Sequence, residues 1–286
     1  MKHRPQAVAL SLLLAAAPAA FAAKPTTQHP THKPLVFKSA RPTQDEAHES
    51  FARRVRSDLA ALLSRPAHMR PRDWERLGMG VAAVGAAATV DNELQTRIQR
   101  HRSSSSDNLA NAIRPAGGVG ALGAMGITWL VGEAGHNANL KSTAEDGLEA
   151  SLIAGGLITP ALKIIVGRAR PAEGLGASSF HPFSHDYSFP SGEATEAFAV
   201  ASVVSAHTHS LLLKSTVWGL AGAVGWERMD LNRHWSSDIV AGALIGAEVG
   251  HWVVARHKHA APRRVDVMLV PTVAPGAWGV SGDIAW

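Results

Sequence analysis

The sequence contains no cysteine and a single tyrosine, and charged residues make up only 18% of its 286 residues. The absence of cysteine excludes disulfides, thiolate zinc sites, iron–sulfur clusters and a cysteine nucleophile. Long uninterrupted apolar runs are also scarce, because Glu149, Glu196 and Glu248 fall within hydrophobic segments. A membrane span needs about 20 predominantly apolar residues. The sequence therefore favours a compact, exported helical domain, with membrane association and insertion of several helices as open alternatives.

Apolar and small residues are plentiful, since hydrophobic residues account for 46% of the chain and glycine occurs 26 times. Small residues in this proportion indicate closely packed helices rather than a β-sandwich. The formal net charge of +5 suggests an anionic partner such as phosphate, acidic lipid or nucleic acid. The basic residues are spread out, without interleaved aromatic residues, which argues against nucleic acid.

Residues 1–22 have the pattern of a secretory signal peptide. A basic start, a short apolar stretch and a small-x-small end follow one another: Lys2-His3-Arg4, Ala7–Ala20 and Ala20-Phe21-Ala22. An N-terminal membrane anchor is the alternative, and Pro18 and the shortness of the apolar stretch argue against it. We therefore expect an exported protein of the periplasm or cell envelope, with a membrane-embedded protein as the alternative.

The remainder of the chain divides into four parts. Residues 23–44 are rich in proline, threonine and basic residues and predict a flexible leader. Residues 45–73 predict an amphipathic helix and a connection, because apolar residues recur at helical spacing: Phe51, Val55, Leu59 and Leu62. Residues 74–256 form the predicted helical domain. Residues 257–286 form a tail, in which Pro275-Gly276 separates the two predicted strands of a β-hairpin.

The helical domain alternates apolar runs with polar connections. The runs are Leu77–Val90, Gly117–Val131, Gly147–Val166, Ala194–Leu213, Ser215–Trp226 and Asp238–Ala255. Strand-like alternation is absent from this region, so the fold class that we predict is all-α, a bundle of about six core helices. The connections include a predicted loop at His101–Asn108 and a long one at Arg168–Pro190.

Two segments at the ends of apolar runs carry groups that bind anions. The first contains Lys163 and Arg170, and Pro171 ends its helix. The second contains Ser191 and Gly192 at the start of a helix, where exposed N–H groups and the helix dipole favour an anion. Taken singly, each pattern is common at ordinary helix ends.

A third segment supplies a candidate nucleophile. Arg228, His234 and Asp238 precede or begin the last apolar run. In a helical conformation, His234 and Asp238 lie one turn apart on one face. The carboxylate can then hold one ring nitrogen and leave the other basic, as a histidine nucleophile or base requires.

The three segments occur in the order of a known signature. They read KIIVGRARP from Lys163, PSGE to Glu193 and ERMDLNRHWSSD to Asp238. They resemble Lys-x6-Arg-Pro, Pro-Ser-Gly-His and Ser-Arg-x5-His-x3-Asp of the type-2 phosphatidic acid phosphatase / vanadium haloperoxidase superfamily. The resemblance implies a helical phosphatase that works without metal or cofactor on a phosphorylated small molecule or lipid.

The resemblance also implies a role for each site residue. His234 is the nucleophile that forms a phosphohistidine, Asp238 orients it, and Glu193 stands where the family has its general acid. The remaining site residues bind the phosphoryl oxygens: Lys163, Arg170, Ser191, Gly192 and Arg228. Converging cations fit phosphoryl transfer, which depends mainly on positioning and charge stabilisation.

Two residues depart from the signature. Glu227 replaces a serine, and Glu193 replaces the histidine. Glu193 can act as an acid/base with a raised pKa, act only as a base for water, or pair with a site arginine. His181 or His185 could replace it as the acid. A vanadate-dependent haloperoxidase and a non-catalytic phosphate- or lipid-binding relative are the alternatives to a phosphatase.

Overall fold

The computed structural model describes residues 44–260, 266–274 and 277–285. Pro42–Lys258 form one compact unit, and the C-terminal hairpin belongs to a separate unit. The signal peptide predicted at 1–22 and nearly all of the leader predicted at 23–44 lie outside the described residues.

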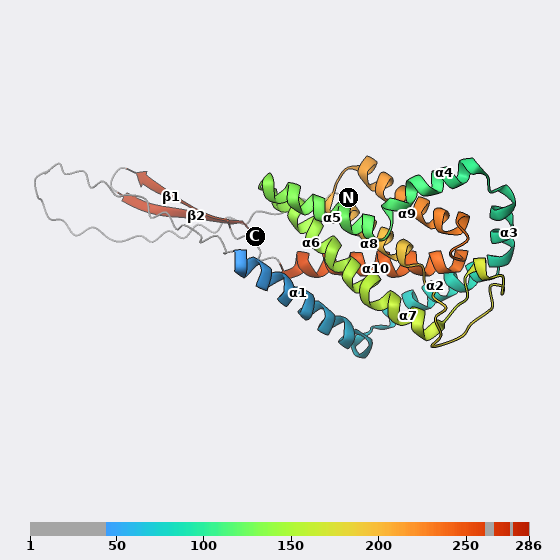
Figure 1. Ribbon diagram of the computed structural model, residues 1–286. Helices are drawn as coiled ribbons and strands as arrows, with labels where there is room; N and C mark the ends of the chain where they lie inside the picture. The colour runs from blue at the N-terminus through green and yellow to red at the C-terminus, as the bar shows by residue number, and fades with distance from the viewer. Residues whose placement is uncertain (1–43, 261–265, 275–276, 286) are drawn as a thin grey trace, which may run out of the picture. The chain divides into compact units, whose positions relative to one another are not determined.

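The first unit is built from helices, as the sequence predicts (Figure 1). In chain order they are α1 (Gln44–Ser64), η1 (Arg65–His68), α2 (Pro71–Ala88), α3 (Asp91–His101), α4 (Ser104–Ile113), η2 (Arg114–Ala116), α5 (Val119–Ala134), α6 (Ala138–Ile153), η3 (Ala154–Ile158), α7 (Thr159–Val166), η4 (Pro171–Glu173), α8 (Gly192–His207), α9 (Leu211–Asp230) and α10 (Ser236–Ala260). The segment η3 is a π-helical turn, and Ala138–Val166 is one long helix through it.

Local sequence explains several helix ends. The hydroxyl groups of Ser191 and Ser210 cap α8 and α9 by accepting hydrogen bonds from backbone N–H groups three residues later. Gly167 ends α7 in the left-handed conformation, at φ 55°. The long connection then runs from Gly167 to Ser191, close to the prediction, and contains the short η4 and a β-bridge between Arg168 and Phe180.

Some predicted boundaries are wrong. The chain breaks at Thr208–Ser210, within the run predicted as Ala194–Leu213, so the next helix begins at Leu211. The predicted loop His101–Asn108 mostly belongs to α4, which Ser103 caps. The helix α3 escaped prediction because its packed face is polar: the Gln95 amide donates to the Met229 carbonyl of α9 at 3.0 Å.

The helix α8 lies at the centre of the unit and packs against α5, α6 and α9. It also lies against α10, where Gly242, Gly246 and Gly250 face its backbone. A Cβ atom on Gly246 would stand 2.1 Å from the Thr195 carbonyl oxygen, so only glycine permits this approach. One core cluster joins α6, η3, α8 and α10: Ala150, Ile153, Ala154, Ala199, Val203, Val249, Val253 and Val254.

Much of the surface of this unit is apolar. Exposed large side chains include Val119, Ile127, Leu130, Leu152, Ile165, Leu211 and Leu212. By length and composition, Ala138–Val166 and Ser236–Lys258 could each cross a membrane, and the bent pair Ser104–Ala116 and Val119–Ala134 could form a third span.

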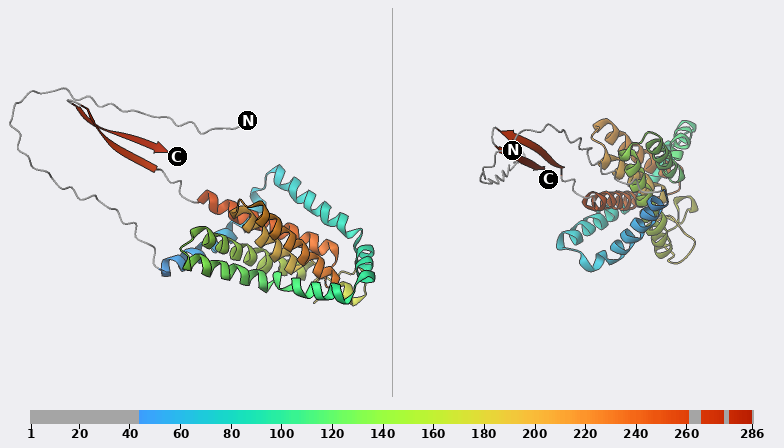
Figure 2. Two further views of the ribbon diagram at one scale, coloured as in Figure 1. Left: turned by 90° about the horizontal axis from the view of Figure 1, so that it is seen from above. Right: turned by 90° about the vertical axis from the view of Figure 1, so that its left-hand side faces the viewer.

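The tail contains the predicted hairpin. Strand β1 (Asp266–Ala274) pairs antiparallel with β2 (Ala277–Ala285), from Asp266 opposite Ala285 to Ala274 opposite Ala277. Figure 2 shows the two strands side by side, as a twisted antiparallel pair.

Candidate active site

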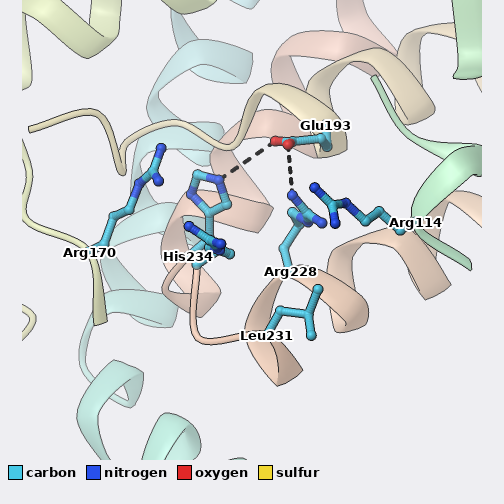
Figure 3. A pocket seen from close by; sticks show the side chains of 7 residues that line it. Arg114, Arg170, Glu193, Arg228, Leu231 and His234 are labelled. Carbon is cyan, nitrogen blue, oxygen red and sulfur yellow. Dashed lines mark hydrogen bonds and ion pairs between the residues drawn. The ribbon is translucent and has the colours of Figure 1, made fainter. Parts of the chain in front are cut away.

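The predicted site residues gather where several helix ends meet. Glu193 is in the first turn of α8, Arg228 is in the last turn of α9, and Asp238 is in the first turn of α10. His234 lies in the short connection between α9 and α10. Figure 3 shows Glu193, Arg228, His234 and Arg170 around one pocket.

His234 is buried, and its ring is held at one nitrogen. Nδ1 lies 2.8 Å from the backbone carbonyl oxygen of Ser188. In this arrangement Nδ1 carries the proton and donates it to that oxygen, so Nε2 keeps its lone pair. Nε2 points towards the pocket, where Glu193 Oε2 lies 3.7 Å away (Figure 3). This geometry suits Nε2 for nucleophilic attack.

Asp238 is fully buried and acts on His234 largely through Ser188. Its Oδ2 is 3.7 Å from His234 Nδ1, beyond hydrogen-bond distance. The same oxygen accepts the Ser188 hydroxyl at 2.6 Å and the Trp235 N–H at 2.9 Å. Because the Ser188 carbonyl holds the imidazole, Asp238 fixes the segment that orients His234.

Arg168 is a buried residue that the sequence reasoning missed. Its guanidinium donates to Asp238 Oδ1 at 2.6 Å and to Asp91 Oδ2 at 2.8 Å. The same group contacts the Ser237 hydroxyl and the Ala177 carbonyl. Arg168 therefore neutralises two buried carboxylates and ties α3 to the start of α10.

Glu193 forms an ion pair within the pocket. Its Oε1 accepts a hydrogen bond from Arg228 Nη1 at 2.7 Å. The contact with His234, which acts in this way when the ring is protonated, and next the charge of Arg228 hold the pKa of Glu193 well below its usual range, although burial opposes the shift. Glu193 is thus ionised at neutral pH and has no proton to donate. This corresponds to the third role that the sequence leaves open for Glu193, an ion pair with a site arginine.

Arg228 is held between two carboxylates. Glu227, which is fully buried, pairs with the guanidinium through both of its oxygens, while Glu193 pairs from the pocket side. Although burial opposes it, the hydrogen bonds and charges of Glu227 and Glu193 raise the pKa of Arg228. Replacement of the signature serine by Glu227 therefore adds a buried anion beside Arg228, the arginine predicted to bind phosphate.

The described lining of the pocket does not include Lys163, Ser191 or Gly192. The Lys163 ammonium donates to the backbone carbonyls of Tyr187 and Pro190 at 2.6 and 2.7 Å. The Ser191 hydroxyl accepts from the Ala194 N–H at 3.4 Å as the cap of α8. A Cβ atom on Gly192 would be 3.8 Å from Thr159 and 4.0 Å from the Lys163 side chain, which is ordinary contact.

The pocket has a volume of about 190 Å³ and a strongly cationic lining. Its lining residues are Arg114, Arg170, Glu193, Arg228, Leu231, Arg233 and His234. Arg114 and Arg233 were not predicted, although Arg233 directly precedes the candidate nucleophile and could have been suspected for that reason. Four guanidinium groups around one histidine can bind and polarise a phosphoryl group.

The two alternative acids lie on the connection that precedes α8. His181 Nδ1 is 2.6 Å from Asp186 Oδ2, and His185 Nδ1 is 3.1 Å from the Tyr187 hydroxyl. Neither residue contributes to the described lining of the pocket. Neither histidine is therefore placed to protonate a leaving group bound in this pocket.

Sequence comparisons with known proteins found a matching family and a similar relative. The family model of the PAP2 superfamily matches residues 147–261. A lipid A 1-phosphatase of Porphyromonas gingivalis is 34% identical over 118 residues, which are 40% of this chain and 24% of that protein. The match spans about a quarter of the relative's length.

Comparison with solved structures found two matches. A transmembrane PAP2-type phosphatidylglycerolphosphate phosphatase from Bacillus subtilis has a TM-score of 0.52 at 18% identity, covering 67% of this chain and 96% of its own. LpxE of Aquifex aeolicus has a TM-score of 0.44 at 22% identity, covering 58% and 95%.

Fold and site together define the class: an all-α protein with a buried histidine in a cationic pocket at the ends of its helices. Residues 147–261 match the PAP2 superfamily, and this matched region includes Lys163, Glu193, Arg228, His234 and Asp238.

Proposed function

We propose that this protein is a membrane-embedded phosphatase that hydrolyses lipid phosphates through a phosphohistidine on His234. The observation that carries the proposal is the imidazole itself, with Nδ1 anchored on the Ser188 carbonyl and Nε2 facing a pocket of arginines. The superfamily and the names of two relatives, a lipid A 1-phosphatase and a phosphatidylglycerolphosphate phosphatase, support a lipid phosphate as substrate.

The first step transfers the phosphoryl group to the histidine. Nε2 of His234 attacks phosphorus, so a P–N bond forms while the P–O bond to the leaving alcohol breaks. Arg170 and Arg228 hold the phosphoryl oxygens and stabilise their charge. Since Glu193 is ionised, the leaving oxygen takes its proton from water in the open pocket.

The second step restores the enzyme. Water attacks the phosphohistidine, the P–N bond breaks, and inorganic phosphate leaves with Nε2 again carrying its lone pair. Lys163 keeps the Tyr187–Pro190 segment in place through both steps, because its ammonium binds two backbone carbonyls there. Asp238 keeps Ser188, and through it the imidazole, in position.

Glu193 acts in this scheme as a counter-charge to Arg228. An arriving phosphate carries the same sign of charge and competes with Glu193 for the guanidinium. Glu193 thereby restrains affinity for phosphate and eases the release of the product. We therefore expect that removing the Glu193 carboxylate changes the affinity for the phosphate substrate more than it changes the pH dependence of catalysis.

The membrane location rests on the exposed apolar side chains and the long apolar helices. Side chains such as Leu152 and Ile165 point outwards from Ala138–Val166, one of the segments long enough to span a bilayer. Lipid would cover this surface, and the pocket would then open at the membrane boundary, within reach of a lipid headgroup. Export by residues 1–22 is part of the proposal and would place the protein in the cell envelope.

The test is phosphate release by the full chain in detergent micelles that contain phosphatidate, compared with a soluble aryl phosphate. We expect faster release from the lipid. We expect His234→Ala to lower kcat by about a thousandfold or more, since it removes the nucleophile. Quenching with radiolabelled substrate should trap an acid-labile phosphoenzyme in the unaltered chain only.

The matched control is His68→Ala, because His68 is exposed on η1 and should not affect the rate. Full activity of His234→Ala would exclude the mechanism. Phosphate binding without release from either substrate would favour a non-catalytic relative. Bromide oxidation with vanadate and peroxide would favour a haloperoxidase.

A further inference from the structure

A second cluster of ionisable residues lies far from the pocket. Asp58 of α1, Glu149 of α6 and His257 of α10 converge there, and one ligand atom of each lies within 4.8 Å of the others. His257 and the site residue Asp238 occupy opposite ends of α10, about 28 Å apart at 1.5 Å per residue. The cluster therefore contributes nothing to the pocket around His234.

The spacing of the ligand atoms suits a tetrahedral metal ion. His257 Nε2 lies 3.2 Å from Asp58 Oδ2 and 3.6 Å from Glu149 Oε2. Around a zinc ion with bonds of about 2.0–2.1 Å, neighbouring ligand atoms are about 3.3–3.5 Å apart. Two carboxylates and one imidazole nitrogen form a ligand set that zinc accepts in proteins, with a fourth position left for water.

Glu149 provides an independent sign that a partner is missing. Its side chain is fully buried, with 0% exposed. Oε2 accepts from Arg54 Nε at 3.2 Å, but Oε1 has no hydrogen-bond partner among the described residues. A buried carboxylate oxygen without a donor is costly, and a cation bound by the Glu149 carboxylate would offset that cost.

The imidazole of His257 is already oriented as a metal ligand. Asp146 Oδ1 is 2.5 Å from Nδ1, and the other oxygen of Asp146 is 2.8 Å from His207 Nε2. A carboxylate on one ring nitrogen fixes the tautomer that directs the lone pair of the other nitrogen to the metal. Asp146 thus supplies the outer support that histidine ligands ordinarily have.

The charge of the cluster also favours a cation. Four carboxylates meet there, from Asp58, Glu145, Asp146 and Glu149, and two guanidinium groups pair with three of them. Arg54 binds Glu145 and Glu149, while Arg256 binds Asp58 at 2.8 Å. The carboxylates outnumber the guanidinium groups by two, and the fourth, Asp146, contacts only the histidines His207 and His257 among the described residues. With both imidazoles neutral, as metal binding requires of His257, one divalent ion would balance the excess negative charge.

We propose that Asp58, Glu149 and His257 bind a divalent transition metal ion, with Zn²⁺ the best match, as a structural site that fastens α1 to α6 and α10. The site is separate from the phosphatase chemistry. Chelation would release the amphipathic helix α1 and leave the arginine-lined pocket in place.

The experiment measures metal binding by the full chain purified in detergent, stripped with a chelator and then reloaded with Zn²⁺ or Co²⁺. We expect one ion per chain by elemental analysis, visible Co²⁺ absorption bands, a higher Tm with Zn²⁺, and slower amide exchange in α1. We expect Asp58→Asn and His257→Gln to abolish stoichiometric binding. We expect Asp146→Asn to weaken binding by about 10–100-fold, because it removes only the support of the ligand.

The control is His251→Gln, an exposed histidine on the same helix that should bind the ion normally. Metal content and the Co²⁺ spectrum of the unaltered chain decide the proposal even if a variant fails to fold. Less than one bound ion in that chain would overturn it. Equal loss of binding in His251→Gln and His257→Gln would do the same, since it would mean adventitious binding by histidines.

Discussion

At the scale of single residues, the site divides into parts that lie close in sequence and parts that do not. His234 and Asp238 are four residues apart, and Lys163 and Arg170 share one segment, so a local pattern reveals them. Arg168 and Asp91 are 77 positions apart, and their pairing depends on the packing of α3 against the rest of the unit. No local pattern could have predicted that pair.

A residue-scale prediction concerns Glu193→Gln. The variant removes an anion that competes with phosphate for Arg228, so KM should fall by up to about tenfold, an effect that high salt reduces. Because the pKa of Glu193 is well below its usual range, the group does not titrate between about pH 5 and about pH 8. The pH profile of kcat/KM should therefore keep its shape over that range.

The same variant should change acid stability. A carboxyl whose pKa is lower in the folded state stabilises the fold fully above its unfolded pKa of about 4.3, and this contribution disappears as the pH falls towards the folded pKa. Thermal unfolding below about pH 4 should thus depend less steeply on pH in Glu193→Gln. Glu93→Gln, on the exposed face of α3, is the control. An altered profile near neutral pH would mean that Glu193 titrates during catalysis.

At the scale of elements, the close packing of α8 on α10 places the start of α8 beside His234. The glycine-rich composition predicts tight helix packing. The structure shows such packing between α10 and α8, where Gly242 and Gly246 lie against the α8 backbone. The backbone N–H of Ser191 also donates to the Asp238 carbonyl at 3.1 Å, which joins the two helix starts directly.

We expect Gly246→Ala to destabilise the fold by about 1–3 kcal/mol, because the new methyl group collides with the Thr195 carbonyl. Activity should decrease as well, since α8 carries Glu193 next to His234. Gly222→Ala on α9 is the control: nothing lies within 4 Å of its Cβ position, so it should stabilise by up to about 1 kcal/mol. The thermal unfolding of both variants is measured in the same detergent. Equal changes in Tm would contradict this account of the contact between α8 and α10.

Periodicity predicted the apolar helices well and the polar ones poorly. The run Gly147–Val166 falls within a single long helix, and Asp238–Ala255 falls within α10. The helix α3 was missed, because it uses the amides of Gln95 and Gln99 to reach carbonyls at the end of α9. Such a helix buries hydrogen bonds rather than an apolar stripe, so its packed face has no hydrophobic pattern to detect.

At the scale of the whole molecule, glutamates within the apolar runs leave the choice between a soluble domain and a membrane-embedded one open in the sequence. In the structure, Glu149 is fully buried and pairs with Arg54, whereas Glu248 on α10 is exposed. Counting charges along the sequence cannot distinguish an inward-facing glutamate from an outward-facing one. The exposed apolar side chains, which only the structure reveals, support the membrane location that we propose.

We expect the expressed protein to remain in the membrane pellet after alkaline carbonate and to dissolve only in detergent. Leu152→Lys, which puts a charge on the exposed side of Ala138–Val166, should lower the inserted fraction, because a lysine at the centre of a span costs about 2.5–3.5 kcal/mol. The control Thr96→Lys, at an exposed position of α3, should leave the inserted fraction unchanged. Release of the unaltered protein by carbonate would exclude insertion.

The clustering of the catalytic groups at one end of the helices has a further consequence for the proposed enzyme. An enzyme whose pocket opens at only one boundary of the bilayer samples only one leaflet. Its substrate range in a cell is then set by the direction in which the chain is inserted as much as by the arginines around His234. The same polypeptide inserted the opposite way would encounter a different lipid population with no change in its chemistry.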